Sequence, residues 1–405
     1  MDERSGRDSE RWLPISIGLF WISLYTYFPT LPAYVRERGG DLAAVGLVVG
    51  SYGLSQAVLR IPLGLLADLR GVRKPIALAG FVISVLGAVG LALATTPAGL
   101  LAFRTLTGVA ASTWVATSVM LASHFPPQKA VRASSLALFL TAGAQVVATS
   151  AGGVLAEHLG WRAPFVAAAV VGAVGLAFLW QVPEAPKRRQ RTPPTVRDLA
   201  AQARSPVLLS VSMAAALFQY VATATTGGFV PVYAAELGAS PAQLGWVTTA
   251  VLIPYTLTAL AAGRVSERWG ERRSLLVGAA LLTLSTLATP WCALLRQLMA
   301  MRVLYGVGMG LANPVLMGLS IKTVPDEKRA AAMGFFQAVY AVGMFVGPAV
   351  SGLLANRWGT AAVFWVAAAV ALVIGLVGLG AAQPQPLGWR WPARPGLGSS
   401  TGQGR

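Results

Sequence analysis

The stretch GLLADLRGVRK at residues 64–74 lies between two long apolar segments, and a similar stretch, GRVSERWGERR, occupies residues 263–273. Each copy begins with a glycine, continues with a carboxylate (Asp68 or Glu267), and ends with a second glycine followed by basic residues. The copies are 199 positions apart (263 − 64), which is close to half of the 405 residues. A repeat of this length in an apolar chain predicts two similar membrane bundles in tandem.

The composition indicates a membrane protein. The chain is 55% hydrophobic and 12% charged, whereas soluble domains carry roughly 25% charged residues. A helix needs about 20 apolar residues to cross the hydrocarbon core of a bilayer. The apolar stretches are continuous rather than alternating, which predicts helices. There are twelve, at about 12–35, 42–66, 75–95, 98–122, 133–156, 163–182, 206–235, 241–262, 274–292, 295–321, 330–355 and 361–381.

The net charge of +17 is distributed as the positive-inside rule predicts. If the N-terminus is cytoplasmic, 24 of the 32 Lys and Arg residues fall in cytoplasmic segments, five in outer segments, and three, Arg60, Arg104 and Arg302, within helices. We therefore expect a multi-pass protein of the plasma membrane with both termini in the cytoplasm. The lipid bilayer, and not a nucleic acid, is the expected partner of this basic chain.

Two segments interrupt the apolar pattern. Residues 183–205 contain several prolines and six basic residues. They are expected to form a cytoplasmic linker between six-helix bundles at residues 1–182 and 206–382. Residues 383–405 are rich in Pro, Gly and Ser, so we expect a disordered cytoplasmic tail there.

Several functional classes lack their sequence signals. His124 and His158 are far apart without ligand-like neighbours, and Cys292 is the single cysteine, so we expect no metal site, cofactor or disulfide. No Gly-Lys pair occurs, so the phosphate-binding loop of an ATP-driven pump is missing. No nucleophile–base pair is apparent, so we do not expect an enzyme.

The landmarks together resemble the major facilitator superfamily of secondary transporters, over the whole chain apart from its termini. The family's loop motif, Gly-x-Leu-Ala-Asp-Arg-x-Gly-Arg-Arg, is matched at Gly64, Leu66, Ala67, Asp68, Gly71 and Arg73. Leu69 and Val72 replace expected arginines. The second copy keeps Gly263, Arg268, Gly270 and Arg272, with Glu267 in place of the aspartate. The family's Arg-x-x-x-Gly pattern of helix 4 is met by Arg104 and Gly108 and repeats at Arg302 and Gly306.

The resemblance implies an all-α membrane fold of twelve transmembrane helices in two pseudo-symmetric bundles that rock about a central site. It also implies a cytoplasmic gate in the two loop motifs, in which Asp68 would face the start of helix 11 near Ala330 and Glu267 the start of helix 5 near Ala133. Unpaired amides and the helix dipole favour a carboxylate at such positions. The alternative is that these charges only anchor their loops. The gate residues are Asp68, Gly71, Arg73, Glu267, Gly270 and Arg272.

Helix 11 carries small residues at the spacing that permits close helix packing, Gly343, Gly347, Pro348 and Gly352. In the drug/proton antiporters of the family, a Gly-Pro motif of this kind belongs to helix 5. This chain has Val147-Ala148 at that place, so the pattern departs from the antiporter signature.

Ionisable groups within a membrane are costly and usually face a cavity. Arg104 and Arg302 occupy equivalent points of the two halves, where they either bind an anionic or carbonyl-bearing solute or hold their bundles together. Arg60 lies near the cytoplasmic end of helix 2, where its side chain would extend toward the headgroups, and we interpret it as structural. In the family, helices 1, 4, 7 and 10 line the cavity. The other candidates for substrate contact are Tyr25, Trp114, Gln219, Tyr220, Asn313, Gln337 and Tyr340.

All fifteen acidic residues fall in loops or at helix ends. The coupling ion, whether a proton or another, therefore stays open. The pattern is closest to the drug and metabolite efflux branch, and we expect a monomer that exports drugs or amphipathic metabolites. Uptake or exchange of an organic anion or other metabolite, by a facilitator or symporter, is the alternative. A membrane sensor that does not transport is the alternative from another functional class.

Overall fold

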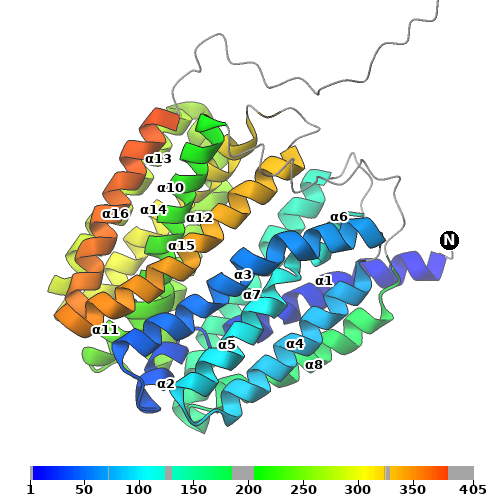
Figure 1. The fold of residues 1–405 in the computed structure, drawn as a ribbon, viewed down its shortest axis with the longest axis horizontal. Helices are drawn as coiled ribbons and strands as arrows, with labels where there is room; N and C mark the ends of the chain where they lie inside the picture. Colours follow the sequence, from blue (N-terminus) through cyan, green and yellow to red (C-terminus); the bar gives the residue numbers. More distant parts are fainter. Residues whose placement is uncertain are drawn as a thin grey trace, which may run out of the picture.

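The computed structural model describes residues 3–71, 73–123, 130–184, 205–322, 324 and 329–381, and this part of the chain contains helices and no strands. Figure 1 shows two helical bundles whose long axes are inclined to one another. The all-α fold with two bundles is thus confirmed.

The first bundle is formed by residues up to Gln181. The passes predicted at 12–35 and 98–122 are each divided between two helices. The helices are α1 (Glu3–Tyr25), α2 (Leu31–Glu37), α3 (Leu42–Arg70), α4 (Lys74–Leu93), α5 (Pro97–Ser112), α6 (Trp114–Ser123), α7 (Ala130–Leu159) and α8 (Ala163–Gln181).

The second bundle begins at Pro206. A π-helix, η2, interrupts its first pass, and a short 3-10 turn, η3, follows its third. The elements are α10 (Pro206–Ala222), η2 (Thr223–Phe229), α11 (Val230–Glu236), α12 (Pro241–Trp269), α13 (Glu271–Ala288), η3 (Thr289–Trp291), α14 (Leu295–Lys322), α15 (Arg329–Trp358) and α16 (Thr360–Ala381).

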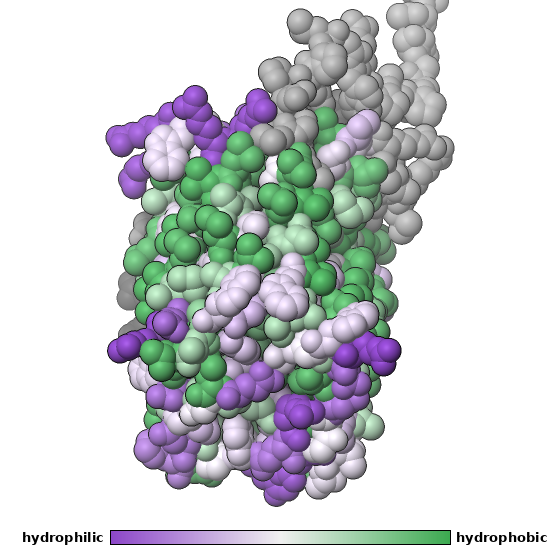
Figure 2. All heavy atoms as spheres, turned by 90° about the vertical axis from the view of Figure 1, so that its left-hand side faces the viewer, coloured by the Kyte–Doolittle hydropathy of each residue, from purple (hydrophilic) through white to green (hydrophobic). Residues whose placement is uncertain are grey.

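The helices match the predicted membrane segments. Among the described residues, ten helical stretches are long and apolar enough to cross a bilayer, and two shorter apolar helices, Trp12–Tyr25 and Thr360–Leu376, supply the remaining segments. The surface in Figure 2 carries a broad apolar belt between hydrophilic rims at top and bottom. A belt of this kind is what a bilayer would cover.

The turns show that the two bundles are built alike. In the described residues, six glycines have a left-handed φ between 62° and 86°, a conformation that glycine adopts without a steric penalty. They form three pairs, each 199 positions apart: Gly39 with Gly238, Gly71 with Gly270, and Gly160 with Gly359. The duplication seen in the loop motifs therefore extends to the backbone of the turns.

The first pass of each bundle is interrupted at the same place. In the first bundle, turns at residues 26–30 separate α1 from α2. In the second bundle, the equivalent residues 225–229 belong to the π-helix η2. The two interruptions touch, because a Cβ atom at Gly227 would lie 3.0 Å from Cζ of Phe28. Both bundles thus break their first pass where the bundles meet.

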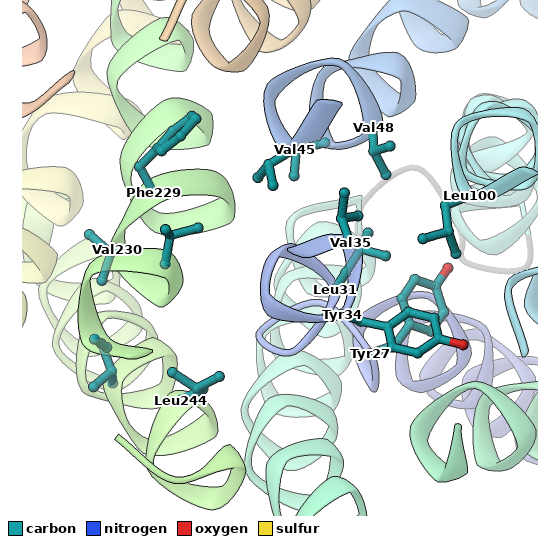
Figure 3. Close-up of a cluster of buried hydrophobic side chains, with 14 of the residues drawn as sticks. Tyr27, Leu31, Tyr34, Val35, Val45, Val48, Leu100, Phe229, Val230 and Leu244 are labelled. Atoms are coloured by element: carbon teal, nitrogen blue, oxygen red, sulfur yellow. The ribbon is translucent and has the colours of Figure 1, made fainter. Parts of the chain in front are cut away.

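The bundles contact each other chiefly through α3 with α15 and α7 with α12. We call the end that carries α2 and α11 the α2–α11 end, and the opposite end, where α3 and α12 finish at Arg70 and Trp269, the loop-motif end. One apolar cluster spans both bundles at the α2–α11 end; Figure 3 shows Val45 of one bundle on the side that faces Phe229 of the other. The other two large clusters draw their buried residues from one bundle each. The apolar core therefore joins the bundles at the α2–α11 end.

Candidate functional site

Glycines permit backbone contact between the bundles at the α2–α11 end. A Cβ atom at Gly46 of α3 would collide with the Pro348 carbonyl oxygen and lie 2.8 Å from Cα of Gly352 on α15. In the other interface, a Cβ atom at Gly245 of α12 would lie 3.3 Å from Cα of Gly153 on α7. Gly46 and Gly245 are 199 positions apart, as are Gly153 and Gly352. The two interfaces are therefore equivalent glycine-on-glycine contacts.

Polar contacts reinforce each interface beside its glycine pair. Asp41 caps the N-terminus of α3 and accepts a hydrogen bond from Nδ2 of Asn356 on α15, at 3.2 Å. Ser240 caps the N-terminus of α12, and its hydroxyl donates to Oε2 of Glu157 on α7 at 2.5 Å. The Ala242 amide donates to the same oxygen at 2.9 Å. In each interface, a carboxylate at a helix N-terminus thus bridges the bundles.

Replacing Glu157 by glutamine should weaken closure of this end. Glutamine lacks the negative charge that the Ser240 hydroxyl and the Ala242 amide meet at the N-terminus of α12, so the variant should shift the equilibrium toward opening. The readout is labelling of a Val49→Cys thiol, since Val49 is buried near η2 at the bundle interface. Glu37→Gln, at an exposed glutamate of the same end, is the matched control. Equal labelling rates in the two variants would contradict the role of Glu157.

Arg60 joins the bundles closer to the loop-motif end. It lies on α3 and is 8% exposed. Its Nη2 donates to Oε1 of Gln56 at 2.6 Å, and its Nη1 reaches across to α15, where it contacts Oε1 of Gln337 at 3.4 Å and the Tyr340 hydroxyl. The interpretation of Arg60 as a side chain that extends toward the headgroups is wrong, because the guanidinium group is buried between the bundles.

Aromatic and polar side chains surround Arg60. Tyr25, the last residue of α1, lies within electrostatic range of Arg104, Tyr340, Tyr255 and Arg60. The Tyr255 hydroxyl accepts a hydrogen bond from Nδ2 of Asn313 at 2.9 Å. We call Tyr25, Gln56, Arg60, Tyr255, Gln337 and Tyr340 the central cluster. It brings together three of the predicted residues with three that were not predicted.

Arg104 and Arg302 do not meet. Arg104 stays within the first bundle, with its guanidinium carbon 4.3 Å from the centre of the Tyr52 ring. Arg302 stays within the second bundle, where its Nη2 donates to Oγ1 of Thr289 at 2.6 Å and its guanidinium carbon lies 4.8 Å from the centre of the Tyr305 ring. Both side chains are almost fully buried. These contacts favour the interpretation that each arginine holds its own bundle.

The remaining predicted cavity residues lie at the edge of the central cluster or inside the second bundle. Trp114 begins α6, and its ring centre lies 5.2 Å from that of Trp21, which in turn is 5.7 Å from Tyr25. Gln219 is half-buried and Tyr220 is buried on α10. A Cβ atom at Gly347 would lie 2.5 Å from the Tyr220 carbonyl oxygen, so the backbone at Tyr220 packs directly against α15.

The four small residues predicted on helix 11 lie on two sides of α15. Gly343 and Gly347 face α10 of the same bundle, where a Cβ atom at Gly343 would collide with the Ala216 carbonyl oxygen. Pro348 and Gly352 face Gly46 on α3 of the other bundle. The motif therefore lets α15 approach one helix in its own bundle and one in the partner bundle.

The first loop motif forms the turn between α3 and α4. Gly71 ends α3 with φ 62°. Arg73 is buried and precedes α4, and its backbone amide donates to Oε1 of Glu184 at 3.0 Å. The Lys74 amide donates to the same carboxylate. Glu184, which follows α8, thus occupies the N-terminus of α4, and sequence reasoning missed it. The side chain of Asp68 lies outside the described residues.

The second loop motif borders a hollow at the loop-motif end. Glu267 is exposed and, with Gly263, Gly270 and Gly318, lines a hollow of ≈ 500 Å³ between α12 and α14. Gly270 separates α12 from α13 with φ 84°, and Arg272 is exposed on α13. Lys322 of α14 and Glu271 of α13 also line the hollow and form an ion pair at 2.7 Å. The predicted contact of Glu267 with the start of α7 stays a prediction.

Comparisons with known proteins agree with this architecture. The chain is 32% identical over 150 residues to the tetracenomycin C resistance and export protein of Streptomyces glaucescens (36% of this chain and 28% of the relative). It is 32% identical over 140 residues to the probable anion transporter 3, chloroplastic, of Arabidopsis thaliana (34% and 27%). The chain thus spans little more than a quarter of either relative.

A solved structure shares the fold over almost the whole chain. A bacterial homolog of the human lysosomal transporter Spinster, in an inward-facing and unoccupied conformation, matches with a TM-score of 0.76. The match covers 94% of this chain and 96% of that one at 16% identity. The sequence profile of the Major Facilitator Superfamily matches residues 15–235 and 212–396. The chain therefore belongs to the major facilitator superfamily, a family of multi-pass membrane transporters.

Proposed function

We propose that this protein exports small organic solutes across the plasma membrane by alternating access, with the loop-motif end in the cytoplasm. One observation carries the proposal. Equivalent glycine and carboxylate contacts close the α2–α11 end. Beyond them, the central cluster lies between the bundles, with Gln56 and Arg60 buried and its other members half-buried. A site of this kind between two pivoting bundles suits a carrier whose faces open in turn. The likeness to an export protein supports the direction of transport.

Uptake or exchange of an organic anion is the second candidate. It is favoured by Arg60, whose guanidinium group lies between the bundles with neutral hydrogen-bonding partners. The likeness to a probable anion transporter supports the same class of solute.

Flux measurements in proteoliposomes test the proposal. We expect outward movement of amphipathic solutes, measured with and without an imposed proton gradient. Net movement in the uptake direction only would favour the second candidate. If no solute of a broad panel moves under any imposed gradient, the transport proposal fails and the sensor interpretation is favoured.

Thiol labelling tests the orientation. Cys292 is buried, and burial raises the pKa of its thiol, so it should react slowly and can be replaced by serine as the background. In intact cells, a membrane-impermeant maleimide should label Arg162→Cys, an exposed position at the α2–α11 end, but label Arg272→Cys only after permeabilisation. The reverse pattern would place the loop-motif end outside.

A further inference from the structure

Arg60 combines burial, a full positive charge and contacts to both bundles. Ten residues separate it from the end of α3 at Arg70, a distance of about 15 Å along the helix. Its side chain is 8% exposed, and its hydrogen-bond partners are Gln56 on its own helix and Gln337 and Tyr340 on α15. Of the three arginines predicted within helices, Arg60 is the one seen to bridge the bundles.

The charge of Arg60 is not balanced by a carboxylate in the described part of the chain. Its three partners are neutral amide and hydroxyl oxygens, and its Nε has no hydrogen-bond partner. No carboxylate oxygen of a described residue lies within 4.0 Å of it. Burying a charge without an opposite charge is expensive. Such a site gains most from a ligand that brings a negative charge of its own.

The surroundings of Arg60 also select the shape of a ligand. Its guanidinium carbon lies 5.5 Å from the centre of the Tyr340 ring. Tyr25 lies within electrostatic range of Arg60, as well as of Arg104, and its ring is tilted against that of Phe28, with ring centres 5.1 Å apart. Aromatic rings bind the apolar body of a ligand, whereas a guanidinium group pairs with carboxylate or sulfonate oxygens, often through two hydrogen bonds.

We propose that Arg60 binds the charged group of an amphipathic organic anion, a carboxylate or sulfonate whose apolar body rests against Tyr25, Tyr255 and Tyr340. This inference rests on the proposed transport function, whichever the direction of transport, and names its class of substrate. Gln337 and Tyr340 hold the guanidinium group when no anion is bound, and the anion replaces or joins them. Cations of the same size are repelled by the uncompensated charge.

The test compares three probes of nearly the same shape: naphthoate, naphthylmethanol and naphthylmethylammonium. Binding is measured on the purified full chain by isothermal calorimetry and by the shift of its melting temperature, since a ligand that prefers the folded protein stabilises it. Hydrogen bonds to charged groups contribute enough to favour naphthoate over the alcohol by about tenfold to a hundredfold. The ammonium probe should bind more weakly than both.

Arg60→Gln should remove the preference for naphthoate and leave alcohol binding unchanged, whereas Arg60→Lys should restore part of it. Arg296→Gln, at an exposed arginine outside the gate and the central cluster, is the matched control. Unchanged naphthoate affinity in Arg60→Gln would overturn the inference. If Arg60→Gln does not fold, the comparison of the three probes on the wild-type chain decides, because equal affinities for them would equally overturn it.

Flux separates this inference from the proposed function. If naphthoate binds through Arg60 but is not transported in proteoliposomes, the anion site is supported and the transport proposal is refuted. If neutral amphiphiles are transported at the same rate by wild type and Arg60→Gln, and naphthoate is not preferred, the transport proposal is supported. The assignment of organic anions as the substrate class is then refuted.

Discussion

Gly46→Leu is expected to prevent the α2–α11 end from closing. The new side chain would enter the space occupied by the Pro348 carbonyl and Gly352 of α15. Overpacking of this kind costs about 1–3 kcal/mol, which corresponds to a shift of about five- to 150-fold toward the state open at that end. We expect faster labelling of the buried Val49→Cys thiol and a loss of most transport activity.

The repeat supplies a second variant for this prediction, and an unhindered glycine supplies the control. Gly245→Leu should act in the same direction, because Gly245 meets Thr149 and Gly153 in the equivalent interface. Gly18→Leu is the control, since a Cβ atom at Gly18 meets nothing within 4 Å. The closure mechanism would be refuted if Val49→Cys reacted equally fast in Gly46→Leu and Gly18→Leu.

Gly152→Val should damage folding rather than shift the conformational equilibrium. A Cβ atom at Gly152 would collide with the Thr26 carbonyl oxygen, and both residues belong to the first bundle. The clash is with backbone next to the interruption between α1 and α2, so it persists in both states of a rocking cycle. We expect low yield and early melting, measured by fluorescence-detected size-exclusion chromatography.

The neighbouring glycine gives a sharp contrast. Gly153 faces Pro241 and Ala242 of the other bundle, where a Cβ atom would lie 2.6 Å from the Pro241 carbonyl oxygen. Gly153→Val should therefore fold with near-normal yield and favour the state open at the α2–α11 end. Gly143→Val, on the same helix in open space, should fold with near-normal yield and leave the conformational equilibrium unchanged. Similar melting of the Gly152 and Gly153 variants would contradict the separate roles.

The helices and the duplication were predictable because they depend on patterns that the sequence carries directly. Apolar length marks the membrane segments, and the loop motifs mark the repeat. Neither pattern identifies the neighbour of a long side chain. Arg60 has the reach to extend to the headgroups or to an adjacent helix, and its observed partners on α15 are about 280 residues away in sequence.

Arg104 and Arg302 show a further limit of reasoning from a repeat. Their positions are equivalent, but their neighbours have diverged. The arginines are 198 positions apart and the turn glycines 199, so the position equivalent to Thr289, which accepts from Arg302, is Leu91 or Gly90, and neither has a hydroxyl. The position equivalent to Tyr52, which stacks on Arg104, is Val251. Equivalent arginines therefore turn to different partners, each within its own bundle.

The contact between Phe28 and Gly227 has a consequence for how the two halves came to fit. The two positions are equivalent in the repeat, so in a twofold assembly of identical chains each would meet a copy of itself. With phenylalanine in both halves, two benzyl groups would compete for the same space. With glycine in both halves, the two backbones would leave a void between them. Covalent fusion removes that constraint, because each half can then acquire its own residue. A large ring now rests on an uncovered main chain, an arrangement open to a fused molecule but closed to a homodimer.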